Sequence, residues 1–140
     1  MRAGSPYAHD EAMAGLRIRS VCIVASLVLL AAAPARASDD GAKRHGSCSG
    51  GPGHWKLVVR PATNATMRIR FDIEDVDPGE RWQLFLSVDG RRILTDTKRT
   101  DAEGDVYVKK VTADGRGSHR IKASGVNIDS GGSCEGSVTY

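Results

Sequence analysis

The sequence predicts a small all-β domain built as an antiparallel β-sandwich. Apolar side chains alternate with polar ones over several short stretches, which is the period that places successive side chains on opposite faces of a strand. Gly-, Asp- and Pro-rich turns separate these stretches, and no stretch shows convincing helical periodicity. The chain has 140 residues, enough for one domain and too few for two once an N-terminal leader is set aside.

The N-terminus has the pattern of a secretory signal peptide. Arg17 and Arg19 precede an apolar run over 21–33, and a proline and further small residues follow it. This order is typical of a cleaved leader, and the run is shorter than the roughly 20 apolar residues of a membrane-spanning helix. We expect residues 1–37 to be the signal peptide, with Met13 as an alternative start. The mature protein is then expected to be secreted and extracellular, without a membrane span.

Removal of this leader leaves two cysteines. Cys22 lies in the apolar run, whereas Cys48 and Cys134 remain in the mature chain. Exported proteins usually oxidise such an even pair, so we expect a disulfide between Cys48 and Cys134. Chain-entropy models give a loop of this length about 4–5 kcal/mol of stabilisation. The competing interpretation is two free thiols used for metal binding or catalysis, and no CxxC spacing supports it.

The strands are expected after residue 53. Residues 38–53 are polar and rich in glycine, so we expect a flexible tail there and the sandwich domain over 54–140. Asp89-Gly90 is a two-residue hairpin signal that favours a type I′ turn with positive φ. The expected strands cover 55–60, 67–74, 82–88, 91–95, 106–108, 121–123 and 138–140. Seven short antiparallel strands at this spacing fit an immunoglobulin-like or fibronectin-III-like sandwich.

Several motifs support the same fold by resemblance. They are a Cys-Ser-Gly-Gly motif, a tryptophan soon after it, an Arg-Trp pair that opens a strand and one late cysteine, at Cys48–Gly51, Trp55, Arg81–Trp82 and Cys134. This pattern resembles small secreted proteins of high-GC Gram-positive bacteria that carry no assigned activity, over most of residues 48–140. The resemblance implies an exported bacterial β-sandwich and no particular chemistry.

The charge of the mature chain is nearly balanced, with 16 basic and 15 acidic residues after residue 37. This balance predicts no binding to nucleic acid or to an anionic membrane. Four basic clusters could still meet on one sheet face and attract an anionic wall polymer or an acidic partner. They could equally be a solvated face that prevents pairing between sheets. The clusters are Arg91–Arg92, Lys98–Arg99, Lys109–Lys110, and Arg120 with Lys122.

Acidic residues gather in loops at one end of the predicted sandwich. If successive strands alternate in direction, loops 75–80, 96–104 and 126–133 meet at the pole that carries the disulfide. Their carboxylates could bind a hard cation such as Ca²⁺, but Asp, Gly and Pro are also the residues that form turns. No complete calcium loop is present, and we assign no metal. The candidate binding pole comprises Asp75, Asp77, Asp101, Glu103 and Asp129.

A second candidate surface consists of apolar residues that are out of phase with the inward-facing sets. They are Phe85, Leu94 and Tyr107, together with Val58. If they cluster on one sheet, they form an exposed patch of the kind that often marks a contact site. A bulge, the sheet twist or the tail could instead cover them.

Catalytic patterns are weak in this chain. A hydrolytic site needs a nucleophile, an aligned base and an oxyanion donor, and the sequence has no GxSxG or comparable arrangement. We therefore expect a monomeric, non-catalytic extracellular binding module without a cofactor, directed at an extracellular partner or a cell-wall polymer. The alternative is a carrier of a small ligand or cation at the acidic pole. An enzyme or an enzyme inhibitor has less support.

Overall fold

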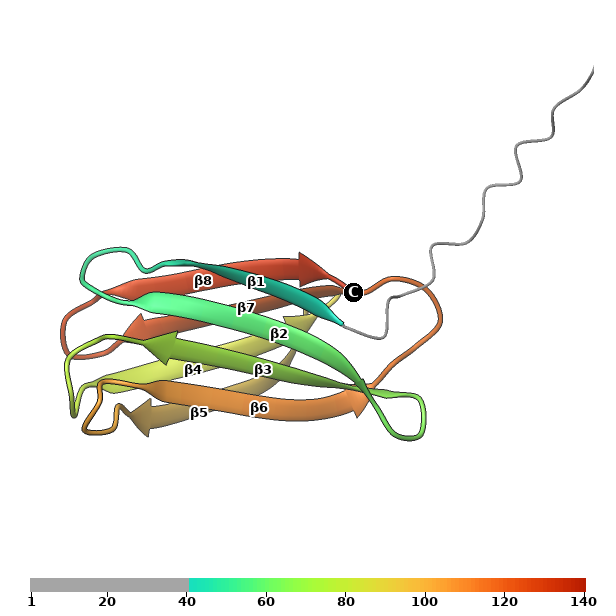
Figure 1. Cartoon of the computed structure of the whole chain (residues 1–140), viewed down its shortest axis with the longest axis horizontal. Coiled ribbons are helices and arrows are strands. Elements are labelled where there is room, and N and C mark those ends of the chain that lie inside the picture. The colour runs from blue at the N-terminus through green and yellow to red at the C-terminus, as the bar shows by residue number, and fades with distance from the viewer. Residues whose placement is uncertain (1–40) are drawn as a thin grey trace, which may run out of the picture. The chain divides into compact units, whose positions relative to one another are not determined.

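The computed structural model describes residues 41–140, which form an all-β domain of eight strands (Figure 1). The predicted signal peptide and start site lie outside the described residues. None of the residues from 41 to 140 forms a helix that could cross a bilayer. The strands are β1 (Ala42–Ser47), β2 (His54–Ala62), β3 (Thr66–Glu74), β4 (Arg81–Val88), β5 (Arg91–Arg99), β6 (Val106–Ala113), β7 (Arg120–Asn127) and β8 (Ser133–Thr139).

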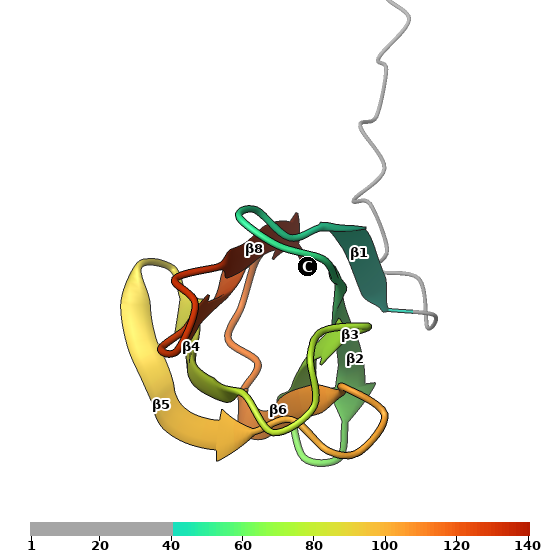
Figure 2. The same cartoon turned by 90° about the vertical axis from the view of Figure 1, so that its left-hand side faces the viewer.

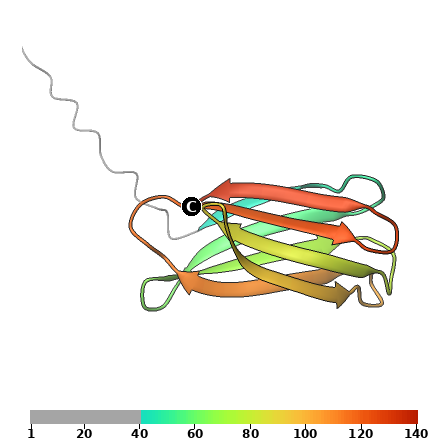
Figure 3. The ribbon, with the colours of Figure 1, turned by 180° about the vertical axis from the view of Figure 1, so that it is seen from behind.

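The strands form two four-stranded antiparallel sheets that pack face to face. Sheet A has the order β1-β2-β3-β6, and sheet B has the order β5-β4-β7-β8. The chain therefore passes between the sheets three times, from β3 to β4, from β5 to β6 and from β6 to β7. Figure 2 shows the two sheets from one end, and Figure 3 shows sheet B from behind with β5 and β8 at its edges. The antiparallel sandwich predicted from the alternation is confirmed.

The period-two alternation builds the core. In β3, Met67, Ile69, Phe71 and Ile73 point inward and have no exposed surface. Full burial of a side chain of this size contributes about 1.5–3 kcal/mol relative to exposure. Sheet B supplies the facing layer, which includes Trp82, Leu84, Leu86, Ile121 and Ala123.

The expected number of strands, seven, is wrong, because the segment expected as a flexible tail contains β1. This strand pairs with β2 along its whole length, from Ala42 opposite Val59 to Ser47 opposite His54. Its sequence, AKRHGS, has no apolar alternation, so the pairing depends on backbone hydrogen bonds at the sheet edge. An edge strand of this kind leaves no signal in hydrophobic periodicity. The seven predicted strands correspond to β2–β8.

The predicted disulfide is confirmed. It joins Cys48, which follows β1, to Cys134 in β8, with the two Cα atoms 4.3 Å apart. Backbone hydrogen bonds of 2.6 and 2.8 Å between Ser49 and Ser133 lie beside it. The bridge therefore connects sheet A to sheet B at the end where β2 and β8 both begin.

Four loops meet at that end, which we call the bridge pole. They cover residues 48–53, 75–80, 100–105 and 128–132. The Val76 amide donates to the Gly104 carbonyl at 3.2 Å, and the Arg81 amide donates to the Asp129 carboxylate at 2.8 Å. The convergence of the last three loops follows the strand directions, as the sequence predicted.

Candidate functional site

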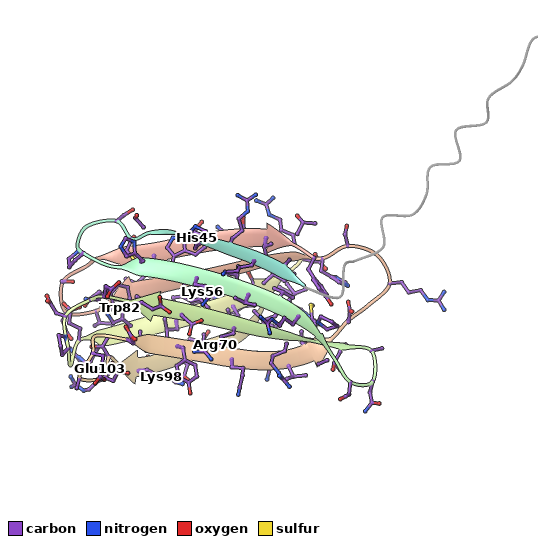
Figure 4. All side chains as sticks on the ribbon, in the orientation of Figure 1. His45, Lys56, Arg70, Trp82, Lys98 and Glu103 are labelled. Carbon is purple, nitrogen blue, oxygen red and sulfur yellow. A yellow bond between two sulfur atoms is a disulfide. The ribbon has the colours of Figure 1, made fainter. Side chains whose placement is uncertain are left out.

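The outer face of sheet A concentrates positive charge. Alternation in β1, β2, β3 and β6 turns every second residue of each strand away from the core. The outward set contains six basic side chains and two carboxylates, a formal charge of +4 on one face. Figure 4 labels Lys56 and Arg70 on this side of the sheet. We call the six basic residues the basic face: Lys43, Lys56, Arg60, Arg68, Arg70 and Lys109.

Strand register brings these cations together. Val58 on β2 lies opposite Lys43 on one side and Arg70 on the other, and Arg70 lies opposite Lys109 on β6. One step along the strands, Arg60 lies directly opposite Arg68. Directly opposed residues have Cβ atoms about 4.5–5.5 Å apart, so like charges in this position repel and destabilise the pair of strands.

A shallow hollow of about 420 Å³ lies within the basic face. Val58 has a short, half-buried side chain, whereas the basic residues around it are long. We call this cavity the Val58 hollow. It is lined by Lys56, Val58, Arg60, Arg68, Arg70, Asp72 and Lys109.

One cation of the face is held in place by its neighbours. The Arg70 guanidinium donates to Asp72 Oδ1 from Nε at 2.7 Å and contacts the same oxygen from Nη2 at 2.6 Å. The hydrogen bond to Asp72 raises the pKa of Arg70 above its ordinary value. The guanidinium also lies 4.6 Å from the centre of the Tyr107 ring. Asp72 is only 5% exposed, so the one carboxylate in the hollow is covered.

The other cations of the hollow have no partner within the described part of the chain. Among residues 41–140, the structure gives no ion pair, hydrogen bond or ring contact to the side chains of Lys56, Arg60, Arg68 and Lys109. Some surface cations on sheet B do have partners: Lys122 pairs with Glu135 at 2.8 Å, and Arg81 pairs with Asp129 at 2.6 Å. The hollow therefore contains one paired cation, Arg70, and four cations that have no partner among residues 41–140, around the apolar side chain of Val58.

The structure separates the residues of the predicted apolar patch. Phe85 lies in sheet B with the Arg92 guanidinium 4.4 Å from its ring centre, whereas Tyr107 lies on sheet A and is 49% exposed. Leu94 pairs with Leu86 and packs against the core, because a bulge after Leu86 changes the phase of β5. The fourth residue, Val58, belongs to the hollow.

The predicted acidic residues Asp75, Asp77, Asp101, Glu103 and Asp129 do lie in loops of the bridge pole. Figure 4 labels Glu103 at this end. Asp101 Oδ1 accepts the amides of Glu103 and Asp105 at 3.1 and 2.8 Å, which is turn chemistry. Asp129 pairs with Arg81 at 2.6 Å, and this side-chain hydrogen bond lowers the pKa of Asp129.

The cavity between the bridge-pole loops beside the disulfide is small. Within the described part of the chain, no three His, Cys, Asp or Glu side chains come together in a way that could hold a metal. A cavity at this pole, lined in part by Cys48, Trp82 and Asn127, measures about 90 Å³. Pockets for small molecules usually measure about 300–1,000 Å³. This pole therefore gives weaker support to the carrier alternative than the basic face gives to anion binding.

Sequence reasoning missed most of the basic face. Of the four predicted basic clusters, only Lys109 belongs to the basic face. Its neighbour Lys110 lies opposite the core residue Ile69, so it is not one of the outward-facing residues of β6. The remaining clusters lie on β5 and β7 of sheet B. A signal was present in Arg68 and Arg70, which alternate with apolar residues in the clearest strand. The strand order that places them between β2 and β6 cannot be deduced from that alternation.

No protein-family model and no curated protein matches this chain.

Proposed function

We propose that this domain is a secreted, non-catalytic binding module whose basic face holds an anionic polymer outside the cell. The N-terminal signal pattern and the Cys48–Cys134 bridge support an extracellular location. The domain acts as a monomer and needs no cofactor, since the face itself supplies the charges. The partner is a cell-wall polymer that carries repeated negative charges.

The observation that carries this proposal is the set of four cations around Val58 that have no partner among residues 41–140. A solvated sheet face usually mixes charges of both signs, and this one sets six basic residues against two carboxylates. Arg60 and Arg68 are directly opposed, at a cost in stability. An anion bound between them removes that repulsion. A binding role therefore explains an arrangement that folding alone disfavours.

We further propose that the sandwich is of immunoglobulin-like or fibronectin-III-like kind. Without β1, the order is β2-β3-β6 against β5-β4-β7-β8, so that β3 pairs with β6 and β4 pairs with β7. These pairings between strands distant in the sequence support an immunoglobulin-like sandwich. In this description β1 is an added edge strand, which widens the basic face by Lys43.

Chromatography on immobilised poly(glycerol phosphate) tests the binding function. The wild-type chain is expected to be retained at low ionic strength and released by moderate salt, because exposed charges are screened within about 10 Å at 0.1 M. Lys109→Gln is expected to elute earlier. Lys110→Gln removes the same charge from the adjacent residue outside the face, so it is expected to elute with the wild type.

Two results would contradict the proposal. One is co-elution of the Lys109→Gln and Lys110→Gln variants, which would show that only net charge matters. The other is stronger retention on an immobilised oligonucleotide than on the wall-type polymer, which would favour nucleic acid as the partner.

A further inference from the structure

The Val58 hollow has the chemistry of a specific anion site rather than of a diffuse charged surface. We infer, as an extension that rests on the proposed function, that the Val58 hollow binds a tetrahedral oxyanion in preference to a carboxylate. This oxyanion is a phosphate or sulfate ester that is repeated along a polymer. The polymer lies on sheet A, and one ester group at a time occupies the hollow.

The donors of the hollow come from three adjacent strands. Lys56 and Arg60 come from β2, Arg68 and Arg70 from β3, and Lys109 from β6. Neighbouring strands are about 4.8 Å apart, and alternate residues along one strand are about 6.6–6.8 Å apart. Flexible side chains at these spacings can turn toward one point above Val58. An anion at that point receives hydrogen bonds from several directions.

A tetrahedral ester suits such a ring of donors better than a carboxylate does. Its free oxygens point in different directions, whereas both oxygens of a carboxylate lie in one plane and one fork-shaped donor can satisfy them. Three of the five donors are guanidinium groups, which present two parallel N–H bonds to phosphate-like oxygens. Arg70 is oriented in advance by Asp72 and Tyr107, which reduces the entropy lost when an anion binds.

Val58 sets the shape of the hollow. A larger apolar residue at this position fills the floor and leaves every charge unchanged. The outer face of sheet B offers a matched position, Val126, which is 41% exposed and lies opposite Gln83. Val58→Phe and Val126→Phe therefore add the same group to the two faces, and only the first change blocks the hollow.

Isothermal titration calorimetry with three oligomers of equal charge number tests this inference. They are a glycerol-phosphate oligomer, a sulfated oligosaccharide and oligoglutamate. We expect the wild type to bind at least one of the two esters about tenfold more tightly than oligoglutamate. The ester that binds with the higher affinity shows whether the ligand of the hollow carries phosphate or sulfate groups. We expect Val58→Phe to lose about tenfold in affinity for that ester, and Val126→Phe to bind as the wild type does.

Equal affinity for all three oligomers, or unchanged binding by Val58→Phe at an unchanged thermal midpoint, would overturn the hollow as a specific site. The proposed function would survive that result if Lys109→Gln still bound more weakly than Lys110→Gln. If Val58→Phe does not fold, Val58→Ile can be used instead, because it fills less of the hollow. We expect Val58→Ile to lose about threefold in affinity for the ester. If no oligomer binds the wild type, both proposals fail.

Discussion

One aromatic side chain, Trp55, closes the seam between the two sheets near the disulfide. Its indole lies against two glycines, Gly46 of β1 and Gly136 of β8. A Cβ atom at Gly46 would lie 2.7 Å from indole Cζ2, and one at Gly136 would overlap the ring. The indole also lies 6.4 Å from the Phe71 ring, measured between centroids. The two glycines therefore provide the space that lets a large ring seal the edge of the core.

Gly136→Ala is expected to destabilise the fold by about 1–3 kcal/mol, because overpacking forces a shift of Trp55 or of β8. Urea denaturation followed by tryptophan fluorescence measures the change. Gly51→Ala is the control, since no atom outside its chain neighbours lies within 4 Å of a Cβ at that position. Equal stability of the two variants would show that the indole does not need this space.

Among the elements, the β4–β5 hairpin and the loop after β6 are joined by one carboxylate. Asp89 and Gly90 have φ of 50° and 79°, as expected for the predicted tight turn. Asp89 Oδ1 accepts the Arg120 amide at 2.8 Å, and Oδ2 accepts from His119 Nδ1 at 2.7 Å. Asp114 Oδ1 lies 3.8 Å from the other ring nitrogen of His119. The hydrogen bond with Asp89 raises the pKa of His119, and the same bond lowers the pKa of Asp89.

These directions fix the sign of a pH effect. The contribution of His119 to stability is complete below its ordinary pKa of 6.5 and is lost as the pH rises through the raised value. Asp89→Asn is expected to lower the pKa of His119, measured by NMR titration of the imidazole, and to reduce this fall in stability. Asp96→Asn, on β5, is the control and should leave the imidazole titration unchanged. A raised pKa that persists in Asp89→Asn would contradict the assigned cause.

The pairing of β2 with β3 predicts a conflict between stability and binding. Arg68→Glu places a carboxylate opposite Arg60, so it removes a repulsion and adds an ion pair. Unfolding free energy is expected to rise by about 0.5 kcal/mol, within the range for cross-strand pairs. Retention on poly(glycerol phosphate) is expected to fall. Arg116→Glu is the control, because it makes the same charge change in the loop before β7, away from the basic face. Lower stability of Arg68→Glu than of the wild type would argue against the repulsion.

The sequence predicts strands well where side chains alternate and poorly where the backbone alone makes the pairing. Regular alternation identifies β3, and the Asp89-Gly90 turn identifies the β4–β5 hairpin. The sequence does not predict β1, because its residues are mostly polar and bury little surface. Alternation alone predicts Leu94 on the outer face, and this is wrong because one bulge residue changes the phase of the strand after it. The basic face depends on strand order and register, neither of which alternation encodes.

At the scale of the whole domain, the disulfide keeps Cys48 and Cys134 joined when the chain unfolds. It therefore restricts the conformations that the unfolded chain can adopt. Cys48 and Cys134 are 86 positions apart in the sequence. Replacing both by alanine is expected to lower the unfolding free energy by about 4–5 kcal/mol, chiefly by releasing the unfolded chain. Urea denaturation without reductant measures this loss, and reduced wild type should unfold with the variant. Coincident curves for the variant and the oxidised wild type would contradict it.

The domain also separates charges that nearly cancel in the sequence. Six basic residues lie on the outer face of sheet A, and the candidate acidic residues lie at the bridge pole. Residues 41–140 contain 16 basic and 13 acidic residues, a net charge of +3, and the outer face of sheet A alone has a formal charge of +4. Separation of this kind gives the domain one surface that can attract an anionic polymer without a large overall charge.

Titration of the ¹⁵N-labelled domain with a glycerol-phosphate oligomer, followed by NMR, locates the bound polymer most directly. We expect the largest amide shifts in residues 56–60, 68–70 and 107–109, which are segments of β2, β3 and β6, and we expect moderate salt to reverse them. Largest shifts in sheet B or in the loops of the bridge pole, or no shifts at low salt, would contradict the assignment of function to the basic face.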